Sequence, residues 1–333
     1  MALRLMEMFL PEKNSSEVSA LLGEHEHLDI WHDRLDGQIL VRLLLPAEET
    51  EAVLDNLERH FSGVDGFRII LLPVEATVPR QKPQENEQKG LPQEEQAKAE
   101  RISREELYND IVDSARISKI YIVMVILSSI VAAIGLLQDS VAVIIGAMVI
   151  APLLGPNVAL SLAATLGDME LALSSAKANA AGIAITLALS LLMGSVLTLS
   201  PDIPEIASRT RVGLSDVVLA LASGSAGAFA FTAGVSATLI GVMVAVALLP
   251  PLVTFGMLLG SGYFVDAKAA LLLFLTNLIC VNLAGIITFL IQGIRPVTWW
   301  EAEKAKKATR VAIILWVVLL STLAGLILLS HRK

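Results

Sequence analysis

Two apolar segments that lie 95 positions apart contain the residues of this chain best suited to bind a small solute. The first reads G-A-M-V-I-A-P-L-L-G-P-N-V from Gly146, and the second reads G-V-M-V-A-V-A-L-L-P-P-L-V from Gly241. The shared glycine, methionine, leucines, valines and proline make this an internal repeat, in which Pro156 corresponds to Pro251. Proline lacks an amide N–H and its ring clashes with the preceding turn, so we expect both helices to break at the same place.

A helix that restarts after such a break presents free N–H groups with a partial positive charge. Two such ends suit an anion or a carboxylate-bearing solute, and the carbonyls of the preceding half-helices can hold a cation. Gln138 and Asn277 would add neutral polar contacts to the solute. The expected substrate-binding residues are Gly146, Pro152, Gly155, Pro156, Asn157, Asn179, Gly241, Pro250, Pro251, Thr254 and Asn282. The alternative is that the asparagines and small residues only pack helices together.

Ionisable residues near the apolar segments are few. Proton coupling usually needs an ionisable group inside the membrane. Asp139 and Asp216 are the coupling candidates, although acidic residues near helix ends more often cap helices or face water. No histidine lies between residues 61 and 330, and the single Cys280 sits in an apolar segment. We therefore expect no enzyme and no cofactor.

Charge divides the chain into two parts. Residues 1–118 contain 13 Lys and Arg against 24 Asp and Glu, a net charge of −11, whereas residues 119–333 contain 12 against 9 and carry +3. The whole chain is 54% hydrophobic, with a mean hydropathy of +0.67. An acidic soluble part therefore precedes a part embedded in a lipid bilayer, and the acidic part excludes nucleic acid as an expected partner.

The second part predicts a polytopic helical membrane protein. A bilayer core needs about 20 apolar residues per helix. Seven segments qualify: 120–137, 141–166, 178–199, 214–234, 235–259, 269–292 and 311–329. The motif Asn179-Ala-Ala-Gly-Ile183 in the third segment recurs as Asn282-Leu-Ala-Gly-Ile286 in the sixth. Three spans per copy would place the copies in opposite orientations, so we expect a 3+3 inverted repeat with discontinuous helices and an added seventh helix.

The first part predicts a small α+β domain. Residues 2–10, 28–32, 39–45 and 67–72 are expected to be strands, with helices after Asn14 and over 47–61, and Asp36-Gly37 suits a hairpin turn. The order β-α-β-β-α-β is that of a ferredoxin-like fold. His25, His27 and His32 form a short His-rich tract that can bind a metal, but solvated turn residues are the ordinary case and no metal is expected.

These segments give six expected regions. They are a cytoplasmic ferredoxin-like domain over 1–78, a charged flexible linker and juxtamembrane helix over 79–118, membrane repeats over 119–200 and 214–294 with an extracytoplasmic loop at 201–213, and a basic loop with a seventh span over 295–333. No secretory signal is visible, because Arg4 and Glu7 interrupt the first apolar stretch. The basic residues of the last loop place it, and the N-terminus, in the cytoplasm.

Three motifs resemble a known family. They are Leu72-Pro-Val-Glu-Ala-Thr-Val-Pro79, the run S-S-I-V-A-A-I-G-L-L from Ser128, and G-A-M-V-I-A-P-L-L-G-P from Gly146. The chain is similar over nearly its whole length to the prokaryotic "uncharacterised hydrophobic domain" membrane proteins. That resemblance implies a multi-pass protein of the inner (plasma) membrane with a soluble N-terminal domain, and it implies no activity.

The residues favour a transporter or channel for a small molecule or ion, either an anion or a polar metabolite, with its site at the paired breaks near the bilayer midplane and with the N-terminal domain as a regulator. The alternative is a membrane-anchored ligand sensor or assembly protein without transport. An anchor does not need seven spans or duplicated breaks. The sequence leaves the oligomeric state open, a homo-oligomer included.

Overall fold

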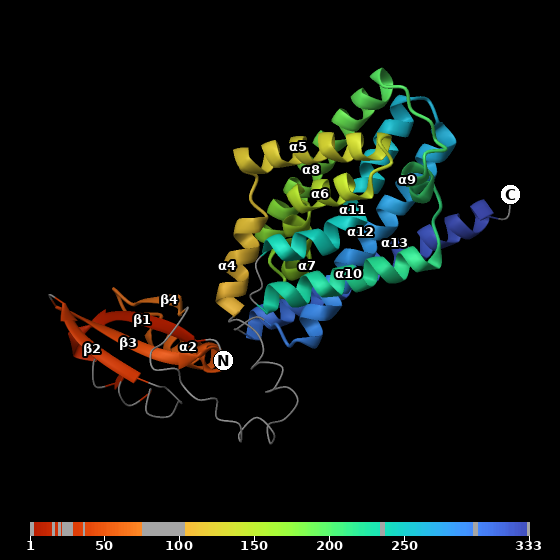
Figure 1. Ribbon diagram of the computed structural model, residues 1–333. Coiled ribbons are helices and arrows are strands. Elements are labelled where there is room, and N and C mark those ends of the chain that lie inside the picture. The colour runs from red at the N-terminus through yellow and green to blue at the C-terminus, as the bar shows by residue number, and fades with distance from the viewer. Residues whose placement is uncertain are drawn as a thin grey trace, which may run out of the picture. The chain divides into compact units, whose positions relative to one another are not determined.

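The computed structural model describes residues 3–14, 17–18, 21, 29–35, 37–74, 104–233, 237–295 and 299–331, for some of them the backbone alone. The chain forms two compact units, Met1–Tyr108 and Asn109–Lys333 (Figure 1). The boundary falls inside helix α4 (Arg104–Ser114). Each unit has a hydrophobic core of its own.

A four-stranded antiparallel sheet forms the first unit. Its strands are β1 (Leu3–Pro11), β2 (Asp29–Leu35), β3 (Gln38–Pro46) and β4 (Arg68–Val74), in the order β2-β3-β1-β4. Gly37, in the β2–β3 turn, has a φ of 77°, which a glycine adopts without strain. The antiparallel sheet and its hairpin are as expected, whereas most of the expected first helix lies outside the described residues.

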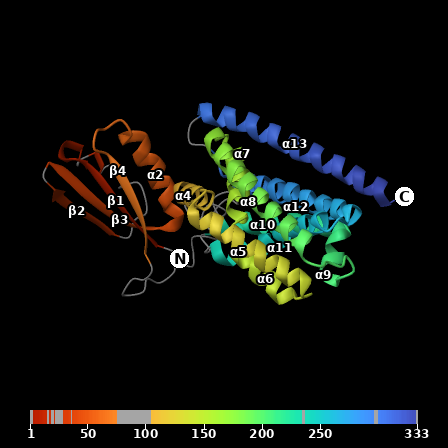
Figure 2. The ribbon, with the colours of Figure 1, turned by 90° about the horizontal axis from the view of Figure 1, so that it is seen from above.

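Helix α2 (Ala47–Phe61) covers one face of this sheet (Figure 2). Val53, Leu57 and Phe61 lie on its buried side, and alternate residues of β1 such as Met6 and Met8 face them. These helical and strand periodicities are the ones that the sequence predicts. The register pairs Glu7 of β1 with Arg42 of β3. The hydrogen bond from the guanidinium to Glu7 and the nearby charge of Asp33 raise the pKa of Arg42.

The first turn of α4 belongs to the first unit through two ion pairs. Arg4 donates to both carboxylate oxygens of Glu106, at 3.0 and 2.9 Å. Arg104 donates to Asp55 of α2 at 3.2 Å. These partly buried pairs join β1 and α2 to α4 within the unit.

The second unit is a bundle of apolar helices. They are α5 (Lys119–Leu137), α6 (Val141–Ile150), α7 (Leu154–Leu166), α8 (Met169–Val196), α10 (Leu214–Thr232), α11 (Ala237–Gly260), α12 (Phe264–Ile291) and α13 (Trp299–His331), with short turns α9 (Pro204–Ala207) and η3 (Ser208–Thr210) between α8 and α10. Figure 2 shows α13 running along the outside of the bundle beside α12.

Five of the described helices are long and apolar enough to cross a membrane, and α6 with α7 passes the same test as a bent pair. The sequence predicts seven spans. The remaining one corresponds to α11, of which only Leu248–Gly260 has described side chains. Helix α8 begins well before the expected Ala178, because the Asp168 carboxylate accepts the Leu171 N–H at 3.0 Å and caps the helix at Met169.

Hydrogen bonds and close approaches give the directions of several helices. Tyr121 Oη donates to the Ala178 carbonyl at 2.9 Å, and Ser129 Oγ donates to Thr186 Oγ1 at 3.0 Å. From the first contact to the second, the residue number increases along both helices. Helices α5 and α8 therefore run parallel.

The same holds for α10 and α12. A Cβ on Gly224 would lie 2.7 Å from the Cα of Val281, and Gln292 Nε2 donates to Thr232 Oγ1 at 2.6 Å. These two helices therefore also run parallel, with Gly224 allowing their backbones to approach closely.

Candidate functional site

The chain breaks between α6 and α7 at Ala151 and Pro152. A proline disfavours the helical conformation of the residue before it. Ala151 accordingly has extended φ and ψ of −68° and 119°, although its N–H still bonds to the Ala147 carbonyl at 3.1 Å. The two helices meet at an angle of 53°. Pro152 is therefore the residue that ends α6.

The prediction of a matching break at Pro156 and Pro251 was wrong. Pro156 is the third residue of α7, where its missing N–H would have had no intrahelical partner. In the second copy, Pro250 and Pro251 lie inside α11, which continues from Ala237 to Gly260. At the repeat spacing of 95, Pro152 corresponds to Ala247, so the residue that interrupts the first copy has no counterpart in the second.

Three of the predicted asparagines meet in one buried network beside the break. Asn157 of α7 donates from Nδ2 to Asn179 Oδ1 of α8 at 2.9 Å, and to the Leu153 carbonyl at 2.7 Å. Asn282 of α12 donates from Nδ2 to Asn157 Oδ1 at 3.0 Å. All three side chains are buried. The network therefore joins helices from both copies of the repeat.

Ser161 extends the network by one turn of α7. Its hydroxyl lies 3.1 Å from the carbonyl of Asn282 and 3.1 Å from the carbonyl of Asn157, and so provides a donor for either, while Gly285 lies against it with no room for a Cβ. Ser161 is not among the binding residues predicted from the sequence. Its spacing from Asn157 and Thr165 places all three on one face of a helix, so this polar stripe was detectable from periodicity alone.

These contacts also give the direction of α7. Asn157 meets Asn282, Ser161 meets Gly285, and Thr165 lines a cavity together with Leu290. Helices α7 and α12 therefore run parallel.

The start of α7 is covered by the end of α4. A Cβ on Gly155 would collide with the carbonyl of Ser114 and would lie 2.8 Å from its hydroxyl. Ser114 therefore lies directly against the first turn of α7, where the sequence predicts an anion site. Gly155 allows the close approach that the sequence predicts, whereas a Cβ on Gly146 would meet nothing within 4 Å.

The other predicted binding residues lie in different surroundings. Thr254 of α11 is buried, and in the described part of the structure its hydroxyl has no hydrogen-bond partner. Asn277 is also buried, in α12, and Gln138 follows the end of α5. Gly241 lies in the part of α11 where only the backbone is described.

The two coupling candidates are found at helix ends, outside the amide network. Asp139 accepts the N–H of Glu205 at 3.0 Å. Asp216 accepts the N–H of Gly213 at 2.8 Å and so caps the start of α10. His25 and His27 lie outside the described residues, and His32 is exposed on β2. Within the described ranges, no group of three His, Cys, Asp or Glu side chains could hold a metal ion.

Comparison with known proteins gives a family and a relative. Residues 148–283 match the family model described as "Domain of unknown function (DUF389)". The chain is 41% identical over 301 residues to a protein named "Uncharacterized protein MJ0678" from Methanocaldococcus jannaschii, covering 90% of this chain and 91% of the relative. No solved structure matches the chain.

Proposed function

The chain belongs to the DUF389 family of proteins of unknown function, and we propose from its own residues that its membrane unit transports a small polar solute. The observation that carries this proposal is the buried hydrogen bond between Asn157 and Asn282 beside the helix break. Buried polar groups in a membrane helix bundle commonly mark a solute path. Here they also join the two copies of the repeat.

The helix directions support a 3+3 inverted repeat. Helices α5 and α8 run parallel, so the chain must return between them through the bent pair α6 and α7, which acts as one broken span. Helix α7 therefore runs antiparallel to α5. It runs parallel to α12, and α12 runs parallel to α10. The first helices of the two copies, α5 and α10, therefore run in opposite directions, as an inverted repeat requires.

The buried groups favour an uncharged solute over an anion. In the described part of the membrane unit, no Asp, Glu, Lys or Arg side chain is buried. Transfer of an unpaired ion into such surroundings is far more costly than transfer of a neutral group that gains hydrogen bonds. Amide side chains both donate and accept, so they suit a polyol, an amide or a similar neutral molecule.

In the structure the amides bind one another, which corresponds to a closed site. A solute would enter by replacing the bond between Asn157 and Asn282, and the two copies of the repeat would separate around it. The charge pattern supports an inner (plasma) membrane location with the N-terminal unit in the cytoplasm.

The proposal is tested with purified protein in sealed liposomes. Flux is measured for uncharged polar solutes, small anions and monovalent cations, with wild type, Asn282→Leu and Thr276→Val. Asn282→Leu keeps the side-chain size but removes the amide. Thr276→Val is the matched control, because Thr276 lies buried in the same helix and its hydroxyl donates to the Leu272 carbonyl of that helix, at 2.8 Å. We expect flux of an uncharged solute that Asn282→Leu abolishes and Thr276→Val retains.

A sensor or assembly protein without transport is the second candidate. It is favoured by the fact that the amides satisfy one another, as they would in a static core. Close packing of α8 on α11 also fits this role, since a Cβ on Gly194 would lie 2.7 Å from the Cα of Met257. If folded wild-type protein passes none of the tested solutes, the transport proposal is wrong and this candidate replaces it.

A further inference from the structure

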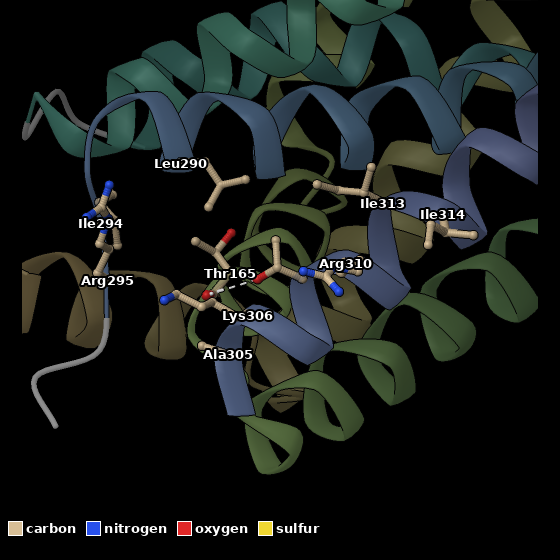
Figure 3. A pocket seen from close by; sticks show the side chains of 10 residues that line it. Thr165, Leu290, Ile294, Arg295, Ala305, Lys306, Arg310, Ile313 and Ile314 are labelled. Atoms are coloured by element: carbon tan, nitrogen blue, oxygen red, sulfur yellow. Dashed lines mark hydrogen bonds between the residues drawn. The ribbon is translucent and has the colours of Figure 1, made fainter. Parts of the chain in front are cut away.

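A cavity of about 540 Å³ lies where the ends of α7 and α12 meet the first turns of α13 (Figure 3). It is separate from the amide network. Its walls are mostly apolar, and its charged groups are three cations. The lining residues are Thr165, Leu290, Ile294, Arg295, Ala305, Lys306, Thr309, Arg310, Ile313 and Ile314.

Thr309 fixes α13 at this position. Its hydroxyl lies 2.9 Å from the Ala164 carbonyl and 3.3 Å from the Thr165 carbonyl, and so provides a donor for the last turn of α7. Figure 3 shows Lys306 and Arg310 on neighbouring turns of α13, with Lys306 extending to the left and Arg310 to the right in this view. The Thr309 hydroxyl therefore holds the turns of α13 that carry both cations against the last turn of α7.

Lys306 and Arg310 form a pair of like charges on the wall of the cavity. Lys306 and Arg310 are four residues apart on one helix, where like charges repel. Within the described residues, neither makes an ion pair and no Asp or Glu lines the cavity. Arg295 has a further polar interaction, so the charge argument rests on Lys306 and Arg310. An anion between them would relieve the repulsion.

The walls indicate which anion fits. Leu290, Ile294 and Ile313 provide apolar surface beside the cations. Beyond the cavity, α13 exposes further apolar side chains, among them Leu315 at 54% and Val318 at 55%. A ligand with a phosphate head and hydrocarbon chains would match both surfaces at once, since basic pockets between membrane helices bind the heads of anionic lipids.

We propose that this cavity binds the phosphate head of an anionic phospholipid, with the acyl chains lying along α13. The phosphate pairs with Lys306 and Arg310 of α13, and the lipid fills the space between α13 and the ends of α7 and α12. The site is independent of the proposed transport path, because it shares no residue with the amide network.

Native mass spectrometry of the full-length protein tests the site, after purification from mixed phosphatidylglycerol and phosphatidylcholine. The variants are Lys306→Gln with Arg310→Gln, the charge-conserving pair Lys306→Arg with Arg310→Lys, and Lys307→Gln. Lys307 is the matched control, because it is an exposed cation next to Lys306 that does not line the cavity. We expect wild type, the charge-conserving pair and Lys307→Gln to retain phosphatidylglycerol, and the double Gln variant to retain about tenfold less.

If wild type retains as much phosphatidylcholine as phosphatidylglycerol, the proposal is wrong, whatever the variants do. It is also wrong if the double Gln variant and Lys307→Gln retain equal amounts of phosphatidylglycerol. Glycerol 3-phosphate is added to wild type as a competitor. If this soluble phosphate displaces the lipid at equal concentration, the site takes a free phosphate ester and the lipid assignment is wrong.

Discussion

At the scale of single residues, Gly285 and Gly146 are both glycines in apolar helices, but they have different neighbours. A Cβ on Gly285 would lie 2.7 Å from Ser161 Oγ and 2.9 Å from its Cβ, whereas one on Gly146 would meet nothing within 4 Å. We predict that Gly285→Ala lowers the free energy of unfolding by about 1–3 kcal/mol through overpacking. Gly146→Ala should be neutral or slightly stabilising, because alanine favours the helix.

Thermal unfolding of both variants in detergent checks this prediction. A loss of stability in Gly146→Ala equal to that in Gly285→Ala would contradict it, because the cost would then follow from the helix and not from the contact with Ser161.

The sequence predicted the residue types of the candidate site better than their partners. Asn157, Asn179 and Asn282 were identified individually, but a hydrogen bond between positions 125 apart, such as that of Asn157 with Asn282, depends on tertiary packing. Asp139 and Asp216 were named as coupling candidates. The hydrogen bond that Asp139 accepts could not be predicted, because its donor is the N–H of Glu205 in α9, far along the chain.

At the scale of elements, the position of a proline in its helix decides what it does. Pro152 follows Ala151 in an extended conformation and ends α6, whereas Pro156 sits in the first turn of α7. We predict that Pro152→Ala straightens the 53° bend and reduces solute flux, because Ala151 can then become helical. Pro156→Ala should leave both the bend and the flux nearly unchanged.

The bend is measured by the distance between spin labels at Ile145 and Leu166 in protein with Cys280 replaced by alanine, alongside the liposome assay. An unchanged distance in Pro152→Ala would show that packing, and not this proline, maintains the bend.

The elements were largely predictable where local pattern determines them. Helix α2 and the strands follow from periodicity, and the apolar helices follow from length and hydropathy. The helix break was predicted at Pro156, because this proline is shared by both copies of the repeat. Identity between the copies does not show which proline lies inside a helix and which one ends a helix. The continuous α11 with Pro250 and Pro251 inside was missed for the same reason.

At the scale of the whole molecule, the directions of the helices follow from pairs of contacts that no single sequence reveals. Helices α5 and α8 are parallel because of the contacts of Tyr121 with Ala178 and of Ser129 with Thr186. The close approach of Gly224 to Val281 is one of the two contacts that make α10 and α12 parallel. The repeated motifs predicted an inverted repeat, because each copy contains three expected spans. The inverted repeat that we propose from the helix directions counts α6 and α7 as one crossing.

This arrangement predicts opposite membrane sides for two exposed positions. Ser208 lies in the loop between α8 and α10, and Lys307 lies near the start of α13. In protein with the buried Cys280 replaced by alanine, we expect a membrane-impermeant thiol reagent to label Ser208→Cys from outside intact cells. Lys307→Cys should react only after the membrane is opened, because the basic residues around it favour the cytoplasmic side. Labelling of both positions from the same side would require an even number of crossings between them, which is incompatible with α10, α11 and α12 each spanning the bilayer once.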